Sequence, residues 1–451
     1  MQIKKLQNFG ELLIMSIIRW LKNIIKEQPP GRLITLGFAF IILIGTFLLL
    51  LPISIRPGAE VSFVDALFTS TSAVCVTGLI AIDTADHFTL FGRTVVALLI
   101  QTGGLGVTSV GVGFILLAGK RVGMKGRLLV REALNMGSSK GIVRLLKAIL
   151  LMTLCFELSG AALSFIVFVQ DYPVGKAIEI SLFHSIAAFN NAGFDILGGL
   201  QNLIPYQRNV LLNLTTAVLI FFGGIGFLVI QDLLKHRSLR KISLHSKVVL
   251  STSLFLLAAG TVLLKCTEDI SWLGAFFQSV SARTAGFSTY PIGGFTNAGL
   301  FVLILLMFIG ASPGSTGGGI KTSTFFALMQ SAKNTAVKRQ SSAFHRKLPA
   351  DTISKAFTVM FLSLIVVCTG TFLMCVLEPE YSFIQNLFEV TSAFGTVGLS
   401  TGITPELGAA GKLLLTAIMF IGRLGALTLM SMWVFRPTSN VRYTEESITI
   451  G

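Results

Sequence analysis

The stretch that decides the fold is DALFTSTSAVCVTGL, residues 65–79, because the chain repeats its pattern three more times. Each version begins with a short apolar helical pattern, turns polar, and ends in a glycine followed by a hydrophobic residue. The other versions are EISLFHSIAAFNNAGF (179–194), LGAFFQSVSARTAGF (273–287) and IQNLFEVTSAFGTVGL (384–399). The helical part of each, about ten to twelve residues, is too short to cross a bilayer, which favours a re-entrant half-helix.

Long apolar runs flank every version of this pattern. They lie at 33–52 and 91–118, 142–169 and 208–234, 247–265 and 297–310, and 353–377 and 412–435. We read each run as one span and predict an all-α membrane protein, in which four repeated helix–pore-loop–helix units (eight transmembrane helices) surround a central ion pore. The expected divisions are a basic amphipathic N-terminal segment, four repeats and a tail: 1–32, 33–118, 119–235, 236–332, 333–435 and 436–451.

Composition and charge agree with a membrane protein. The chain is 53% hydrophobic and only 13% charged, with a mean hydropathy of +0.78. Of its 36 Lys and Arg residues, 27 lie in five segments: 1–32, 119–147, 235–247, 333–355 and 434–451. Basic loops stay on the cytoplasmic side, so both termini are expected there, and the net charge of +15 needs no nucleic acid partner. The five scattered cysteines make neither a disulfide framework nor a metal motif.

A glycine ends each short helical pattern. Rings of backbone carbonyls can replace the hydration shell of a cation, and glycine adopts the necessary backbone angles at least cost. One such glycine would be read as a helix C-cap, but four in register predict a short potassium filter. We call the following residues the filter segments: Val76, Thr77, Gly78; Asn191, Ala192, Gly193; Thr284, Ala285, Gly286; and Thr396, Val397, Gly398.

Glycines also recur in the second helix of each repeat. Pairs at 103–104 and 223–224 have counterparts at Gly310 and Gly422, which favours either close helix packing or a shared role beside the filter. Only the third repeat continues into a longer glycine-rich stretch, GASPGSTGGGIK at 310–321. A phosphate-binding loop is a poor match because the spacing is one residue too long and no strand precedes it.

This stretch, the glycine loop Gly310–Lys321, should break its helix in mid-membrane. We expect it to form a flexible gate below the filter, on one side of the pore only. The residues assigned to gating are Gly310, Pro313, Gly314, Gly317, Gly318, Gly319, Lys321 and, from the fourth repeat, Arg423.

Arg423 is an arginine at membrane depth, which is a functional-site hypothesis by default. It could interact with carbonyls of the glycine loop or form a barrier on the ion path. Alternatively it could be a structural bridge to Glu157, which lies mid-span in the second repeat. Arg283, three residues before a filter glycine, is expected to tie its pore helix to nearby acids.

The four filter segments, the broken third-repeat helix and Arg423 resemble the Trk/Ktr/HKT superfamily of potassium transporters. The likeness is closest to the membrane (ion-translocating) subunit of bacterial Ktr systems, through GRLG at 422–425 and VRY at 441–443. It implies potassium uptake across the plasma membrane, sodium stimulation, and gating by the glycine loop and Arg423. It also implies a homodimer, to which 436–451 contribute, on a cytoplasmic nucleotide-binding ring. The chain has no dinucleotide fingerprint of its own, so nucleotide would bind only the separate regulatory subunit.

The alternative is an ion-coupled secondary transporter of another small solute, since such folds also use repeats and broken helices. Four equivalent repeats favour a central pore over a site between two halves. An enzyme is not expected, because the chain shows no paired catalytic acids, zinc motif or Ser/His/Asp set at membrane depth.

Overall fold

The computed structural model describes residues 30–117, 122–133, 141–236, 238, 240–337 and 341–425. The predicted amphipathic segment and the C-terminal tail lie outside the described residues. Within them the fold is helical, apart from one antiparallel hairpin of β1 (Ser342–Ala343) and β2 (Arg346–Lys347).

Each repeat opens with a long apolar helix that is followed by a shorter pore helix. The long helices, each long and apolar enough to cross a membrane, are α2 (Pro30–Leu49), α8 (Ile142–Phe168), α12 (Leu244–Thr267) and α16 (Ala350–Leu377). The pore helices are α3 (Phe63–Cys75), α9 (Val174–Phe189), α13 (Trp272–Ser281) and α17 (Phe383–Gly395). Serine caps begin three of them, at Ser62, Ser271 and Ser382. Ser62 accepts a bond from the backbone N–H of Asp65, and Ser271 accepts one from that of Gly274.

A second helix completes each repeat. These helices are α5 (Leu90–Leu105), α10 (Val210–Ile225), α14 (Asn297–Phe308) and α18 (Ala409–Leu424). The runs 91–118 and 208–234, each read as one span, are not straight. The chain bends by 98° between α5 and α6 (Val107–Leu117), and by 96° between α10 and α11 (Phe227–Lys235).

Glycines cause both bends. Gly106 and Gly226 have φ angles of 83° and 94°, which a right-handed helix cannot contain. Gly425, with φ of 85°, ends α18 at the equivalent place. Four helices are therefore long enough to span alone, and six spans result if each bent pair counts as one, by length and composition of the described residues.

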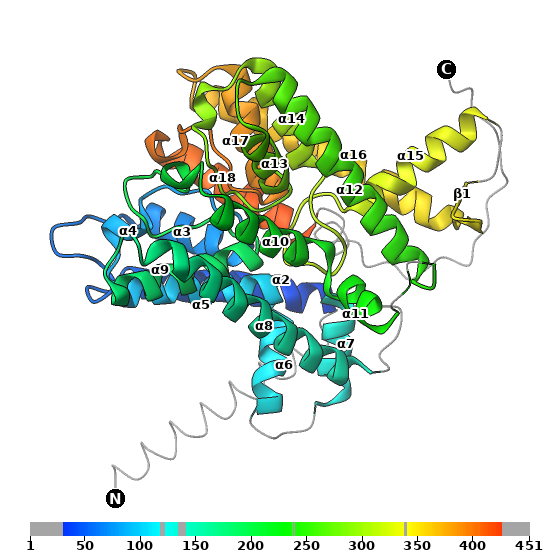
Figure 1. Cartoon of the computed structure of the whole chain (residues 1–451), viewed down its shortest axis with the longest axis horizontal. Coiled ribbons are helices and arrows are strands. Elements are labelled where there is room, and N and C mark those ends of the chain that lie inside the picture. The colour runs from blue at the N-terminus through cyan, green and yellow to red at the C-terminus, as the bar shows by residue number, and fades with distance from the viewer. Residues whose placement is uncertain are drawn as a thin grey trace, which may run out of the picture.

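The repeats close into a ring. The pore helix α3 packs against α2 and α5 of its own repeat and also against α18, near the other end of the chain. Figure 1 shows this meeting of the blue and orange-red parts of the molecule. In the same way α5 contacts α9, α10 contacts α13, and α14 contacts α17, so every second helix touches the pore helix of the next repeat.

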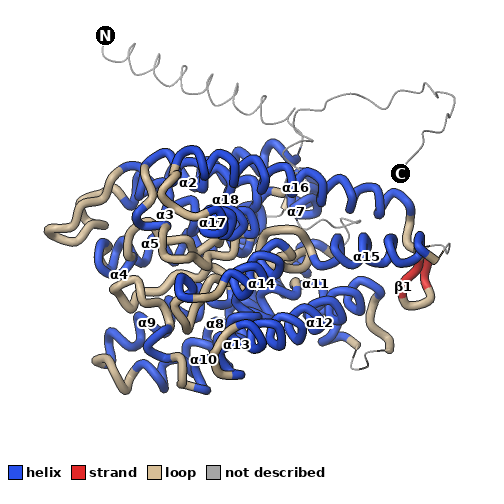
Figure 2. The backbone as a smooth tube through the Cα atoms, turned by 90° about the horizontal axis from the view of Figure 1, so that it is seen from above, coloured by secondary structure: helices blue, strands red, loops and turns tan. Residues whose placement is uncertain are grey.

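The remaining elements connect or extend the repeats. They are α4 (Thr84–His87), α7 (Met124–Ala133), α15 (Thr322–Ala336), and the 3-10 turns η1 (Ile204–Tyr206), η2 (Ile292–Gly294) and η3 (Thr404–Glu406). Seen from above in Figure 2, α15 and the hairpin project at the edge of the helical bundle.

Candidate ion pore

The four pore helices lead into the same backbone turn. Two residues before each filter glycine, a residue that carries a side chain has a positive φ between 50° and 77°; these residues are Val76, Asn191, Thr284 and Thr396. The filter glycines have φ between 67° and 93°. A left-handed residue other than glycine costs about 1–2 kcal/mol, and such strain clusters at functional sites. Its recurrence at one position in four repeats marks these turns as the candidate site.

The filter segments meet around one axis. A Cβ on Gly78 would lie 2.3 Å from the carbonyl oxygen of Ala192 in the second repeat. The same approach continues from Gly193 to Ala285 (2.7 Å), from Gly286 to Val397 (2.3 Å) and from Gly398 back to Thr77 (2.1 Å). Four contacts that return to the first repeat form a closed ring of carbonyl oxygens. A side chain on any of the four glycines would collide with the backbone of the neighbouring repeat.

The glycines of the second helices bring those helices onto the ends of the pore helices. A Cβ on Gly103, Gly223 or Gly422 would lie 2.0 Å from a carbonyl oxygen four residues before a filter glycine. The three carbonyls belong to Val74, Phe189 and Phe394. Both readings of these glycines therefore hold, because the close packing is itself the support of the filter segments.

Serines that sequence reasoning missed fix the turns from within. The Ser72 hydroxyl accepts a bond from the N–H of Gly78 at 3.0 Å and donates to the carbonyl of Leu79 at 2.8 Å. Ser392 accepts from the N–H of Gly398 at 3.0 Å, and Ser281 donates to the carbonyl of Phe287 at 2.5 Å. A serine five or six residues before the glycine in three repeats was the signal available in the sequence.

The glycine loop Gly310–Lys321 lies directly against the filter segments. The N–H of Gly318 donates to the Thr396 hydroxyl at 3.0 Å. The N–H of Thr316 donates to the carbonyl of Gly223 at 3.2 Å. The Lys321 ammonium donates to carbonyls within the loop, at 2.7 Å for Gly317 and 3.3 Å for Gly318. The loop therefore joins the second, third and fourth repeats and closes one end of the ring.

Arg423 reaches across the axis to this loop. It donates to the carbonyl of Thr316 in the glycine loop and to that of Gly103 in the first repeat. Lys321 and Arg423 both line a cavity of about 180 Å³ on this side, together with Gly104 and Phe38. Two cationic side chains in a small cavity oppose the passage of a bare cation.

Arg423 contacts a carbonyl of the glycine loop, which was one of its predicted interactions, and the alternative bridge to Glu157 is wrong. The prediction that Arg283 ties its pore helix to acids is also wrong. The acid Glu157 accepts a bond from Asn190 at 3.0 Å and so is engaged behind the second filter segment, whereas the bonds of Arg423 go to carbonyls. Arg283 is tied to carbonyls rather than to acids, at 3.1 Å for Ser253 and 3.4 Å for Gly310. Both cations are satisfied by backbone carbonyls, and the spacing of residues in the sequence does not reveal which carbonyls they reach.

Comparison with known proteins agrees with this geometry. The model of the TrkH family, described as a cation transport protein, matches residues 33–270 and 255–440. The chain belongs to the TrkH cation transport protein family. It is 39% identical to the Ktr system potassium uptake protein B of Bacillus subtilis, over 97% of this chain and 99% of that protein. It is 38% identical to the potassium/sodium uptake protein NtpJ of Enterococcus hirae, over 97% and 100%.

A solved structure extends the comparison to the fold. The crystal structure of the potassium transporter TrkH from Vibrio parahaemolyticus matches with a TM-score of 0.72 at 18% identity, covering 90% of this chain and 86% of that chain. The predicted fold class and the resemblance to the superfamily are thus confirmed.

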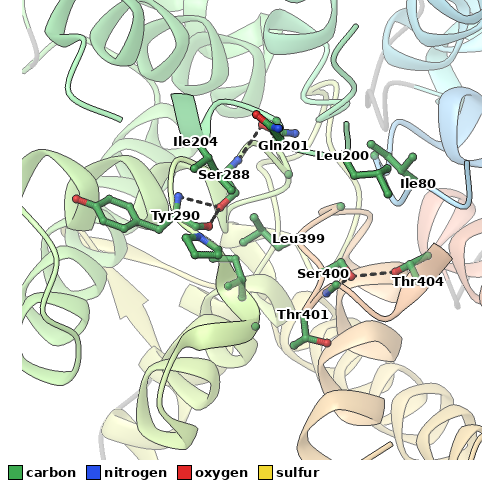
Figure 3. Close-up of a pocket in the computed structure, with 18 of the residues that line it drawn as sticks. Ile80, Leu200, Gln201, Ile204, Ser288, Tyr290, Leu399, Ser400, Thr401 and Thr404 are labelled. Carbon is green, nitrogen blue, oxygen red and sulfur yellow. Dashed lines mark hydrogen bonds between the residues drawn. The ribbon is translucent and has the colours of Figure 1, made fainter. Parts of the chain in front are cut away.

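On the side opposite the glycine loop, this member of the TrkH family has a wide vestibule. The cavity of about 420 Å³ is lined by Gly78, Gly286 and Gly398 and by the polar segments that follow the filter. Figure 3 shows Ser288 and Tyr290 on one side of it, and Ser400, Thr401 and Thr404 on another. The floor of the vestibule is therefore the glycine ring itself.

Two acids shape this vestibule. Glu389, fully buried in α17, accepts bonds from Ser400 (2.8 Å), Thr404 (2.7 Å) and the N–H of Thr401 (2.8 Å), and so holds the post-filter loop. Asp195, beyond the membrane-spanning helices, lines the cavity. Burial, with a smaller contribution from nearby carboxylates, raises the pKa of Asp195 to about 7.

Proposed function

We propose that this protein takes up potassium across the plasma membrane through the ring formed by its filter segments. The observation that carries the proposal is the cyclic contact of four filter glycines with four carbonyl oxygens. Carbonyl rings substitute for the hydration shell of a cation, and the relatives named above are potassium uptake proteins.

The proposed gate is the glycine loop together with Arg423. Its support is the set of bonds that ties the loop to Thr396, Gly223 and Arg423 at one end of the ring. Opening would require these bonds to break. The loop carries four glycines within residues 314–319, so its backbone can rearrange at low steric cost.

The proposal includes partners outside the chain. The name of the Bacillus relatives, Ktr system proteins, indicates a transporter made of several components, which supports a homodimer on a cytoplasmic, nucleotide-binding regulatory ring. The name of the Enterococcus relative, potassium/sodium uptake protein, supports sodium as a second ion. Membrane lipid would cover the apolar outer faces, with both termini cytoplasmic.

Uptake of potassium by a host that lacks its own uptake systems tests the function, with the parent chain compared with Gly78→Ser and Gly286→Ser. A Cβ at either glycine would lie 2.3 Å from a backbone carbonyl oxygen of the next repeat, so both variants should lose preference for potassium over sodium. Gly175→Ser is the matched control, because its Cβ would meet nothing within 4 Å.

The contrary result favours the alternative, an ion-coupled secondary transporter of another small solute. The contrary result is either no potassium uptake, even with a cytoplasmic partner supplied, or filter variants with the same uptake and ion preference as the parent.

A further inference from the structure

We propose that two largely buried ion pairs, Lys412–Asp65 and Arg93–Glu179, position the first two pore helices and thereby help to set the discrimination between potassium and sodium. The inference rests on the proposed function. It adds four residues that lie outside the filter segments and touch neither the filter glycines nor the glycine loop in any described contact.

The two pairs occupy equivalent places. Lys412 is the fourth residue of α18 and Arg93 is the fourth residue of α5. Ten residues after Lys412 comes Gly422, and ten residues after Arg93 comes Gly103. Each of these glycines packs on the end of a pore helix. Their acidic partners stand 13 or 14 residues before a filter glycine, Asp65 in the first turn of α3 and Glu179 in the second turn of α9. The same register at two interfaces indicates a shared role.

Both pairs are short and largely removed from solvent. The Lys412 Nζ lies 2.8 Å from the Asp65 Oδ1, with 12% and 17% of the two side chains exposed. The Arg93 Nε lies 3.1 Å from the Glu179 Oε1, with 11% and 23% exposed. Removing one partner from such a pair leaves an uncompensated charge in a poorly solvated place, and the surrounding elements must shift or admit water.

Each pair crosses between repeats. Lys412 belongs to the fourth repeat and Asp65 to the first, while Arg93 belongs to the first and Glu179 to the second. The first repeat is therefore joined on both sides. At the other two interfaces the equivalent positions are Asn213 and Leu300, neither of which can form an ion pair.

The link to selectivity is mechanical. The acids sit near the beginnings of α3 and α9, and the filter segments directly follow the ends of these helices. Short helices move as rigid bodies, so a displaced first turn shifts the carbonyls of Thr77 and Ala192 in the ring. Potassium and sodium differ in the carbonyl arrangement that they require, hence a small shift should change their ratio before it abolishes transport.

Potassium and sodium uptake by the full chain, in a host lacking its own systems, test the inference with Lys412→Met, Asp65→Asn, Arg93→Gln and Glu179→Gln. Each variant should lower the potassium-to-sodium uptake ratio by about tenfold, the size of a coupling between directly contacting residues. The double variant Arg93→Glu with Glu179→Arg exchanges the two charges and should restore most of the parent's potassium-to-sodium uptake ratio. This double variant still tests the inference if a single variant fails to reach the membrane. Lys355→Met is the control, because its pair with Asp351 is 2.7 Å long but 66% and 74% exposed.

Three results separate the possibilities. If the parent takes up no potassium, the proposed function is wrong. If the parent transports potassium and the four variants change only the amount of protein in the membrane, with the ion ratio unaltered, the pairs are merely structural and the inference is overturned. A charge exchange that reaches the membrane without recovering the ratio overturns it equally.

Discussion

Replacing Gly223 by alanine should damage the filter although position 223 lies on a different helix from the filter. A Cβ there would lie 2.0 Å from the carbonyl oxygen of Phe189, at the end of α9, whereas real Cβ atoms essentially never approach closer than 3.0 Å. The helix must therefore withdraw by about 1 Å or push the pore helix inward. Overpacking of this kind costs about 1–3 kcal/mol, and the gain from removing a mid-helix glycine is about 0.5–1 kcal/mol.

The net loss is then between about 0 and about 2.5 kcal/mol, with a middle value of about 1 kcal/mol, which is a factor of about 5 in an equilibrium. We expect Gly223→Ala to lower both the thermal stability of the purified protein and the potassium-to-sodium uptake ratio. The adjacent Gly224 is the matched control, since its Cβ would meet only the side-chain amide of Asn191, at 3.3 Å. Equal behaviour of Gly223→Ala and Gly224→Ala in both assays would refute the reasoning that second-helix glycines support the filter.

Three further outcomes follow from the vestibule and the gate. Asp195 loses its charge as the pH falls through about 7. The KM for potassium should therefore rise between about pH 8 and about pH 6, by at most about fivefold for the loss of one charge. The KM of Asp195→Asn should not change over this range, and a KM of the parent that is also constant would exclude the effect. Arg423→Gln removes the charged bond to the carbonyl of Thr316 in the glycine loop, worth about 1.5–3 kcal/mol, and should raise potassium flux without a cytoplasmic partner by about tenfold in a flux assay. Thr396→Val removes the acceptor of the Gly318 N–H and should raise the same flux by less; a lower flux in both variants would contradict the assignment of the gate.

The sequence predicted the fourfold arrangement well because its signal is periodic. Apolar runs, short polar-ended helices and terminal glycines recur in register, and the structure places the twelve filter residues in four turns that meet in a ring. The two sharp bends in the second helices were missed. Their cause, Gly106 and Gly226, lies within apolar runs that satisfy the length of a single span, and a hydropathy pattern does not report a change of direction.

The contacts that sequence reasoning missed are those with an irregular backbone. The partners of Arg283 and Arg423 are carbonyls of Ser253, Thr316 and Gly103, and every residue type offers a carbonyl. The sequence therefore left the carbonyls of the glycine loop and the acid Glu157 as alternative partners of Arg423, and it indicated acids for Arg283. Glu157 instead accepts a bond from the Asn190 amide. Pairs such as Lys412–Asp65 join residues 347 positions apart, and only the closure of the ring brings them together.

Some features occur in all four repeats and others in only one, and this difference follows from their positions relative to the ion. An ion on the axis needs ligands from all sides, so the left-handed turn and the glycine occur in every repeat. A single obstruction is enough to stop the ion, so a glycine loop in one repeat suffices, and Arg423 of the fourth repeat joins that loop in the third to the carbonyl of Gly103 in the first. This bridge spans the ring, and releasing it frees both the loop and the charge at once. If the loop is the gate, as proposed, its bond from Gly318 to the Thr396 hydroxyl couples its movement to one filter segment only.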